Sequence, residues 1–166
     1  RFIVEGGPPL EGEIEVSGSK NAALPVLFAT ILHAGRSVVS NVPDLMDIRT
    51  TASLLRTLGL EVELRDDAAY IDAGEVPSHE APYDQVRKMR ASVLALGPLL
   101  ARLGRARVSM PGGCAIGERP VDQHLKGFEA LGATIELEHG YIEARADKLV
   151  GAPIAFDMPT VGGTEN

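Results

Sequence analysis

The segment best suited to chemistry is residues 111–120, which read Pro-Gly-Gly-Cys-Ala-Ile-Gly-Glu-Arg-Pro. It holds the only cysteine of the chain, Cys114, with Arg119 downstream of it. Three glycines and two prolines make a loop more favourable here than a helix or a strand. A cation or a helix start near a thiol favours the thiolate, so Cys114 is a candidate nucleophile or general acid. The alternative is an inert buried cysteine, the commoner state of a lone cysteine in a cytoplasmic protein.

Two further cations stand at predicted helix starts. Lys20 and Asn21 follow a Ser-Gly-Ser turn and precede an apolar run at residues 22–32, and Arg90 precedes a second apolar run at 91–103. A helix start beside small residues suits a phosphate or a carboxylate. The plainer interpretation of Lys20 is an exposed lysine in a capping turn. Together, the three cations and the thiol favour a small polyanionic substrate, with the thiol in proton transfer or covalent catalysis.

The composition narrows the class of partner. The chain has 166 residues, with 16 Lys and Arg against 23 Asp and Glu, a net charge of −7 and 4% aromatic residues. An acidic chain with few aromatic rings argues against nucleic acid as a partner. No apolar run reaches the roughly 18 residues of a membrane span. A single cysteine cannot form an internal disulfide, which predicts a cytoplasmic protein. The histidines do not have the spacing of metal ligands, so we expect neither a metal site nor a cofactor.

The elements that position these residues are predicted from hydrophobic spacing. Alternation predicts strands at residues 2–5 and 13–16, followed by a helix at 22–32 with Pro25 in its first turn. A strand at 37–42 comes next, then a helix with one apolar face. Strands at 60–64 and 69–73 complete the set. Residues 74–82 are predicted to be a linker. The apolar face of the second helix comprises Ile48, Ala52, Leu55 and Leu58.

The same pattern then starts again, which predicts an internal repeat. The apolar run 91–103, the strand 105–110 and a helix face at Val121, Leu125, Phe128 and Leu131 follow the order of the first set. The offset between equivalent residues rises from 68 at Pro43 and Pro111 to 73 at the helix, so the second copy has five extra residues. These lie in the Cys114 loop, where an insertion suggests added function, although surface loops also tolerate neutral changes in length.

Three stretches of the sequence resemble the UDP-N-acetylglucosamine 1-carboxyvinyltransferase (UDP-N-acetylglucosamine enolpyruvyl transferase) family. They are Gly-Ser-Lys-Asn-Ala-Ala-Leu-Pro at residues 18–25, Met-Arg-Ala-Ser at 89–92, and the cysteine loop with its continuation Val-Asp-Gln-His at 111–124. The resemblance covers the whole chain, and the cysteine loop is its most specific part.

This resemblance implies an α/β fold of the α+β type, built from the repeated βαβαββ units of the enolpyruvyl transferase inside-out α/β barrel. The chain would be an N-terminal fragment of a two-domain enzyme. Residues 1–17 would form strands of the second domain, and residues 18–166 an incomplete first domain. That domain would comprise a repeat at 18–83, a repeat at 84–156 and the start of a third at 157–166.

The family transfers enolpyruvate from phosphoenolpyruvate to the 3-hydroxyl of UDP-N-acetylglucosamine and releases phosphate, in the first committed step of peptidoglycan synthesis. The resemblance makes Cys114 the catalytic thiol, which protonates phosphoenolpyruvate, can form an adduct with it and is the target of fosfomycin. The implied phosphoenolpyruvate-binding residues are Lys20, Asn21 and Arg119. The implied UDP-N-acetylglucosamine-binding residues are Arg90, Arg119, Pro120, Val121, Asp122, Gln123, Thr160 and Val161.

The family's general-base aspartate lies later in the chain, so we expect the remainder of the enzyme to complete the site and the fragment alone not to turn over. Two other functions stay open. The sister enzyme 3-phosphoshikimate 1-carboxyvinyltransferase shares the donor but has no such cysteine loop. A sugar-nucleotide binding domain without turnover would not need Lys20, Arg90, Cys114 and Arg119 together.

Overall fold

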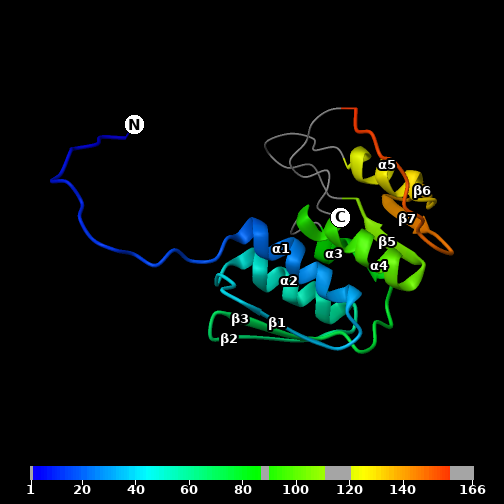
Figure 1. Ribbon diagram of the computed structural model, residues 1–166, viewed down its shortest axis with the longest axis horizontal. Coiled ribbons are helices and arrows are strands. Elements are labelled where there is room, and N and C mark those ends of the chain that lie inside the picture. Colours follow the sequence, from blue (N-terminus) through cyan, green and yellow to red (C-terminus); the bar gives the residue numbers. More distant parts are fainter. Residues whose placement is uncertain (1, 87–89, 111–120, 158–166) are drawn as a thin grey trace.

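A computed structural model describes residues 2–86, 90–110 and 121–157, and its elements fall into two similar sets (Figure 1). The first set is α1 (Lys20–Ala29), η1 (Thr30–Leu32), β1 (Arg36–Ser40), α2 (Met46–Thr57), β2 (Glu61–Arg65) and β3 (Ala68–Asp72). The second set is β4 (Glu80–Ala81), α3 (Tyr83–Val86), η2 (Arg90–Ala95), α4 (Leu96–Leu103), β5 (Arg105–Ser109), α5 (Asp122–Ala130), β6 (Thr134–Glu138) and β7 (Tyr141–Arg145).

The two sheets confirm the predicted internal repeat. The first sheet has the strand order β1-β3-β2 and the second has β4-β5-β7-β6, so β5, β7 and β6 correspond to β1, β3 and β2. All neighbouring strands are antiparallel except β4 and β5, which are parallel. Among the described residues, no strand lies on β1 at the position that β4 takes on β5. Each set is therefore one α/β unit, and the second has an additional edge strand.

The first predicted helix face lies in the core, whereas Leu125 and Leu131 of the second predicted face are only partly buried. Ile48, Ala52, Leu55 and Leu58 of the α2 segment are at most 1% exposed. They face the inner side of the first sheet, where Ala69 and Ile71 are buried at the centre of the strand register. Figure 1 shows α1 and α2 side by side above this sheet. The buried residues of both sets belong to one continuous cluster, so the two units share a core.

Two predicted helices differ from the expected form in where regular α-helix begins or ends. The helix predicted at 22–32 is α1 followed by the 3₁₀ turn η1, and Pro25 lies in its second turn because Ser19 begins the helix earlier than expected. The helix predicted at 91–103 is the 3₁₀ segment η2 followed by α4. Pro98 has no N–H to donate to the carbonyl four residues back and its ring collides with that carbonyl, so regular α-helix begins just before it.

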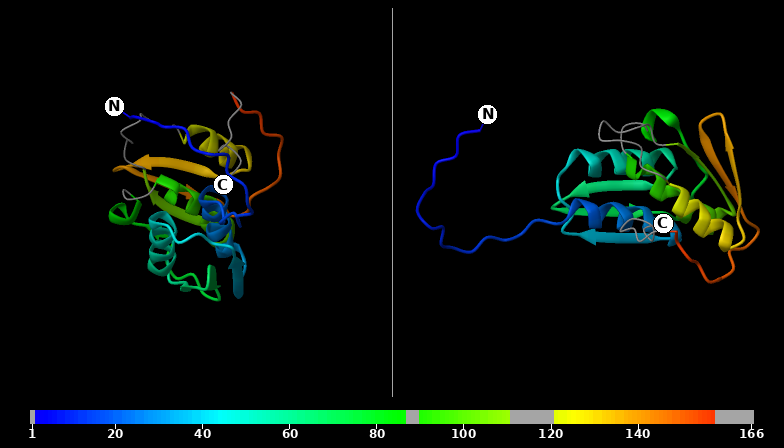
Figure 2. Two further views of the ribbon diagram at one scale, coloured as in Figure 1. Left: turned by 90° about the vertical axis from the view of Figure 1, so that its left-hand side faces the viewer. Right: turned by 90° about the horizontal axis from the view of Figure 1, so that it is seen from above.

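The strands predicted at residues 2–5 and 13–16 do not form within this chain alone. Residues 2–17 form an extended chain without hydrogen-bonded partners among the described elements, and Phe2 is 97% and Ile14 89% exposed. Figure 1 and the right-hand view of Figure 2 show this segment leading away from the helices and sheets. Alternating apolar residues form a strand only when another strand supplies the hydrogen bonds. The assignment of residues 1–17 to strands of a second domain stays a prediction.

The segment predicted as a linker, 74–82, contains β4. Glu80 and Ala81 pair with Arg107 and Val108 of β5, so the connection between the two sets adds an edge strand to the second sheet. Arg107 accounts for part of this attachment, because its guanidinium lies 2.9 Å from Glu80 and 3.0 Å from Glu143. A strand of two residues gives almost no periodic signal, which explains why the sequence did not reveal it. No described helix is both long and apolar enough to cross a membrane.

Candidate functional site

The Gly-Ser-Lys-Asn turn at residues 18–21 starts α1, and it lies in space next to Asn41, the residue that follows β1. A Cβ on Gly18 would lie 1.8 Å from the backbone carbonyl oxygen of Asn41, so only glycine allows this close approach. Ser19 is the N-cap residue, and its hydroxyl accepts a hydrogen bond from the Ala22 N–H at 3.4 Å. Lys20 and Asn21 are therefore the first two residues of α1, as expected for an anion site at a helix start.

Lys20 makes an ion pair that the sequence did not reveal. Its Nζ lies 2.7 Å from Oδ2 of Asp47, which occupies the first turn of α2. The two side chains are 43% and 36% exposed. The pair thus joins the starts of two helices that pack against each other. It directs Lys20, the predicted substrate-binding lysine, toward the N-terminus of α2.

The second predicted cation, Arg90, is the first residue of η2. Its side chain lies outside the described part of the molecule, but the segment that it begins packs against α1. Ser92, two residues later, is fully buried. The structure thus brings the two chain segments that carry Lys20 and Arg90 into contact, without defining the distance between the two cations.

Three of the predicted sugar-nucleotide residues surround the start of α5. Val121 is its N-cap residue and is nearly buried, Asp122 is exposed in the first turn, and Gln123 is 9% exposed. The Gln123 side chain bonds within the chain: its Nε2 donates to Asp122 at 3.0 Å, and its Oε1 accepts from the Asp157 N–H at 3.2 Å. Gln123 therefore ties residue 157 to α5.

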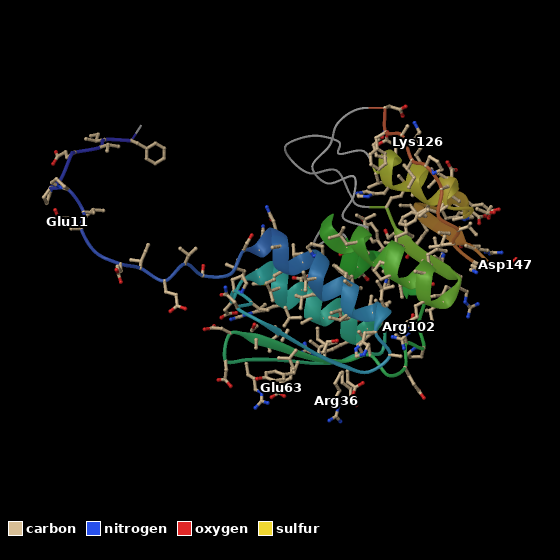
Figure 3. The ribbon with its side chains drawn as sticks, viewed as in Figure 1. Glu11, Arg36, Glu63, Arg102, Lys126 and Asp147 are labelled. Atoms are coloured by element: carbon tan, nitrogen blue, oxygen red, sulfur yellow. The ribbon has the colours of Figure 1, made fainter. Side chains whose placement is uncertain are left out.

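Lys126 strengthens this attachment. Its Nζ lies 2.6 Å from Oδ1 of Asp157, and Figure 3 shows Lys126 on α5 next to the returning chain. The hydrogen bond from Lys126 is the main cause that lowers the pKa of Asp157, followed by the hydrogen bond from Gln123. The carboxylate of Asp157 thus stays charged in the physiological range and holds the end of the described chain at the helix that follows the cysteine loop.

The remaining predicted site residues lie outside the described residues: Cys114, Arg119, Pro120, Thr160 and Val161. Two surface hollows border the first sheet, one at the turn between β2 and β3 and one on the outer face. No predicted site residue lines either of them.

The comparisons with known proteins define the class first. Residues 4–166 match the EPSP synthase (3-phosphoshikimate 1-carboxyvinyltransferase) family, and the chain belongs to this family. Among solved structures, it is similar to the enolpyruvyl transferase NikO from Streptomyces tendae, with a TM-score of 0.72, 24% identity and coverage of 87% of this chain and 32% of that one. It is also similar to EPSP synthase from Acinetobacter baumannii, with a TM-score of 0.63, 18% identity and coverage of 93% and 36%. These likenesses confirm the predicted enolpyruvyl transferase fold.

The sequence relatives are more specific. The UDP-N-acetylglucosamine 1-carboxyvinyltransferase of Desulfovibrio desulfuricans is 62% identical over 166 residues, which is 100% of this chain and 40% of that protein. The protein of the same name from Desulfosudis oleivorans is 60% identical over the same span and share. The chain thus spans about two fifths of the length of these curated relatives. They bear the family name that the cysteine loop and the Lys-Asn turn suggested.

Proposed function

We propose that the protein containing this chain transfers enolpyruvate from phosphoenolpyruvate to the 3-hydroxyl of UDP-N-acetylglucosamine and releases phosphate. The observation that carries the proposal is the identity of 62% to a relative of that name over all 166 residues, including the span that holds Cys114. The chain supplies the thiol, the Lys20 helix start and the Arg90 segment. The remainder of the enzyme completes the site and provides the base.

The proposed reaction is an addition followed by an elimination. Cys114 gives a proton to the methylene carbon of phosphoenolpyruvate, while the sugar 3-hydroxyl adds to the neighbouring carbon and loses its proton to the base. The C–O bond to phosphate then breaks, a proton leaves the new methyl group and the double bond forms again. Lys20, Asn21 and Arg119 hold the phosphate and carboxylate of the donor, since fixed cations and helix N–H groups stabilise anions.

The sugar nucleotide would bind along the second unit. Arg90, Arg119 and residues 120–123 would contact it, together with Thr160 and Val161. Gln123 is nearly buried and bonded to Asp157, so we assign its contribution to holding the chain at residue 157 rather than to a free side-chain contact. The activity would place the protein in cell-wall peptidoglycan synthesis in the cytoplasm, and hence in cell shape and division, with fosfomycin as an inhibitor acting at Cys114.

Phosphate release tests the proposal. The longest product of the gene is expected to release phosphate from phosphoenolpyruvate when UDP-N-acetylglucosamine is the acceptor, and Cys114→Ala is expected to abolish this. The 166-residue chain alone is expected to release none, because the base is missing. Release only with shikimate 3-phosphate would reassign the protein to the sister activity, and binding without release would favour a sugar-nucleotide binding domain.

A further inference from the structure

The ion pair between Lys20 and Asp47 joins two helix starts that point to the same end of the first unit. Lys20 is the first residue of α1, and Asp47 lies in the first turn of α2. The distance of 2.7 Å between Lys20 Nζ and Asp47 Oδ2 corresponds to a charged hydrogen bond. Neither side chain is buried, so the pair is not a packing element of the core.

At the first position of a helix, the local structure does not hold a lysine ammonium group in one place. The positive end of the helix dipole repels an ammonium group, and the long lysine side chain has many rotamers in water. Asp47 has the opposite preference, because a carboxylate is favoured in the first turn of α2. The structure also shows no side-chain cap at Leu45, the residue before α2. Asp47 thus provides a fixed anchor for a cation that would otherwise move.

We infer that Asp47 is a positioning residue that holds the Lys20 ammonium over the starts of α1 and α2, in the place where it meets the anionic donor. The inference rests on the proposed function, in which Lys20 binds phosphoenolpyruvate. Asp47 acts through Lys20 and does not itself touch the substrate. Its carboxylate fixes the cation before the donor arrives, which removes part of the ordering cost of binding.

The direction in which Asp47→Asn changes the KM for phosphoenolpyruvate distinguishes a positioning role of Asp47 from a purely electrostatic one. If Asp47 contributed only its negative charge, Asp47→Asn would strengthen the binding of a polyanion, and the KM for phosphoenolpyruvate would fall. If Asp47 positions Lys20, the same change frees the lysine, and the KM rises. From the strength of an exposed ion pair, we expect an increase of about 2- to 5-fold.

The experiment uses the full-length enzyme and five variants. Asp47→Asn removes the anchor, and Asp47→Glu restores a carboxylate on a longer stem. Asp44→Asn is the matched control, because this substitution removes the same charge from a nearby position. Asp44 pairs with Arg49 at 2.6 Å and not with Lys20. Lys20→Ala, alone and with Asp47→Asn, closes a double-mutant cycle. These substitutions leave the backbone carbonyl of Asp47, which accepts from Thr51, in place.

Steady-state kinetics and lysine chemistry give the outcomes. We expect Asp47→Asn to raise the KM for phosphoenolpyruvate with little change in the KM for the sugar nucleotide, Asp47→Glu to recover part of the loss, and Asp44→Asn to match the wild type. In the Lys20→Ala background, Asp47→Asn should add no further loss. A KM for phosphoenolpyruvate that falls or stays constant in Asp47→Asn would overturn the inference.

A second measurement is independent of turnover. The rate of acetylation of Lys20 by acetic anhydride, read by peptide mass spectrometry against the exposed Lys148, should rise in Asp47→Asn and stay constant in Asp44→Asn. Equal rates for Lys20 in the wild type and Asp47→Asn would contradict the positioning role even if the enzyme were active. A wild-type protein without transfer activity but with this difference in acetylation would overturn the proposed function and leave the Lys20 anchor standing.

Discussion

Replacing Arg102 tests how strongly the two units are joined. Arg102 belongs to α4 of the second unit, but its Nη1 donates to the carbonyl of Ile31 at 2.7 Å and its Nη2 to the carbonyl of Gly74 at 3.0 Å. Ile31 lies in the turn that ends α1, and Gly74 in the connection between the units. Figure 3 shows Arg102 at this junction. One charged side chain thus satisfies carbonyls from two separate segments.

The expected loss follows from these two hydrogen bonds. A hydrogen bond to a charged group contributes about 1.5–3 kcal/mol when buried. The bond to Ile31 is partly buried and the bond to Gly74 is exposed, so we count the first in full and discount the second. Arg102→Met keeps most of the stem volume and removes both donors, and should lower the free energy of unfolding by about 2 kcal/mol. For a chain of this size, that corresponds to a fall in Tm of about 4–8 °C.

The assay is urea or thermal unfolding of the 166-residue chain, followed by circular dichroism. Arg36→Met is the matched control: Arg36 is 88% exposed on the outer face of the first sheet, where it pairs with Asp72, and its loss should leave the unfolding midpoint unchanged. Arg102→Lys should fall between the two, because an ammonium group cannot reach both carbonyls in the fork geometry of a guanidinium. Equal effects of Arg102→Met and Arg36→Met would refute the reasoning.

Two further predictions concern stability. Gly59 and Gly132 are equivalent in the repeat and have φ of +101° and +96°, but a Cβ on Gly59 would lie 2.4 Å from Pro77 whereas one on Gly132 meets nothing within 4 Å. Gly132→Ala should therefore cost about 1–2 kcal/mol of backbone strain in urea unfolding and Gly59→Ala at least 1 kcal/mol more, and equal costs would contradict the predicted clash. Burial, aided by the charge of Arg105, lowers the pKa of His79 below its ordinary value of 6.5, so the unfolded chain binds more protons than the folded chain as the pH falls below 6.5. The free energy of unfolding should fall over that range, and less so in His79→Gln; a fall of the same size in both proteins would exclude His79 as its source.

The repeat was the part of the fold that the sequence predicted best. Apolar residues spaced along one helix face, such as Ile48 and Leu55, are buried as expected, because a surface helix must bury that stripe. The glycines after the two equivalent helices also lie where a positive φ is needed. Local spacing decides these features, so a single sequence is enough to predict them.

Features that depend on partners far along the chain were not predicted reliably from the sequence. The strands expected at 2–5 and 13–16 need neighbouring strands that the described residues do not supply, and β4 is too short to show a period. Asp47 appeared only as a first-turn acid in a helix, since nothing in the spacing shows that the starts of α1 and α2 meet. The Lys-Asn turn, by contrast, was predicted at its observed helix start, because Gly18 and Ser19 carry a local signal.

The decisive measurement of the proposed transfer is phosphate release from phosphoenolpyruvate by the longest product of this gene, with UDP-N-acetylglucosamine and shikimate 3-phosphate as alternative acceptors. We expect release with the sugar nucleotide, no release with shikimate 3-phosphate, and loss of activity in Cys114→Ala. Undiminished release in Cys114→Ala, or release with shikimate 3-phosphate alone, would contradict it.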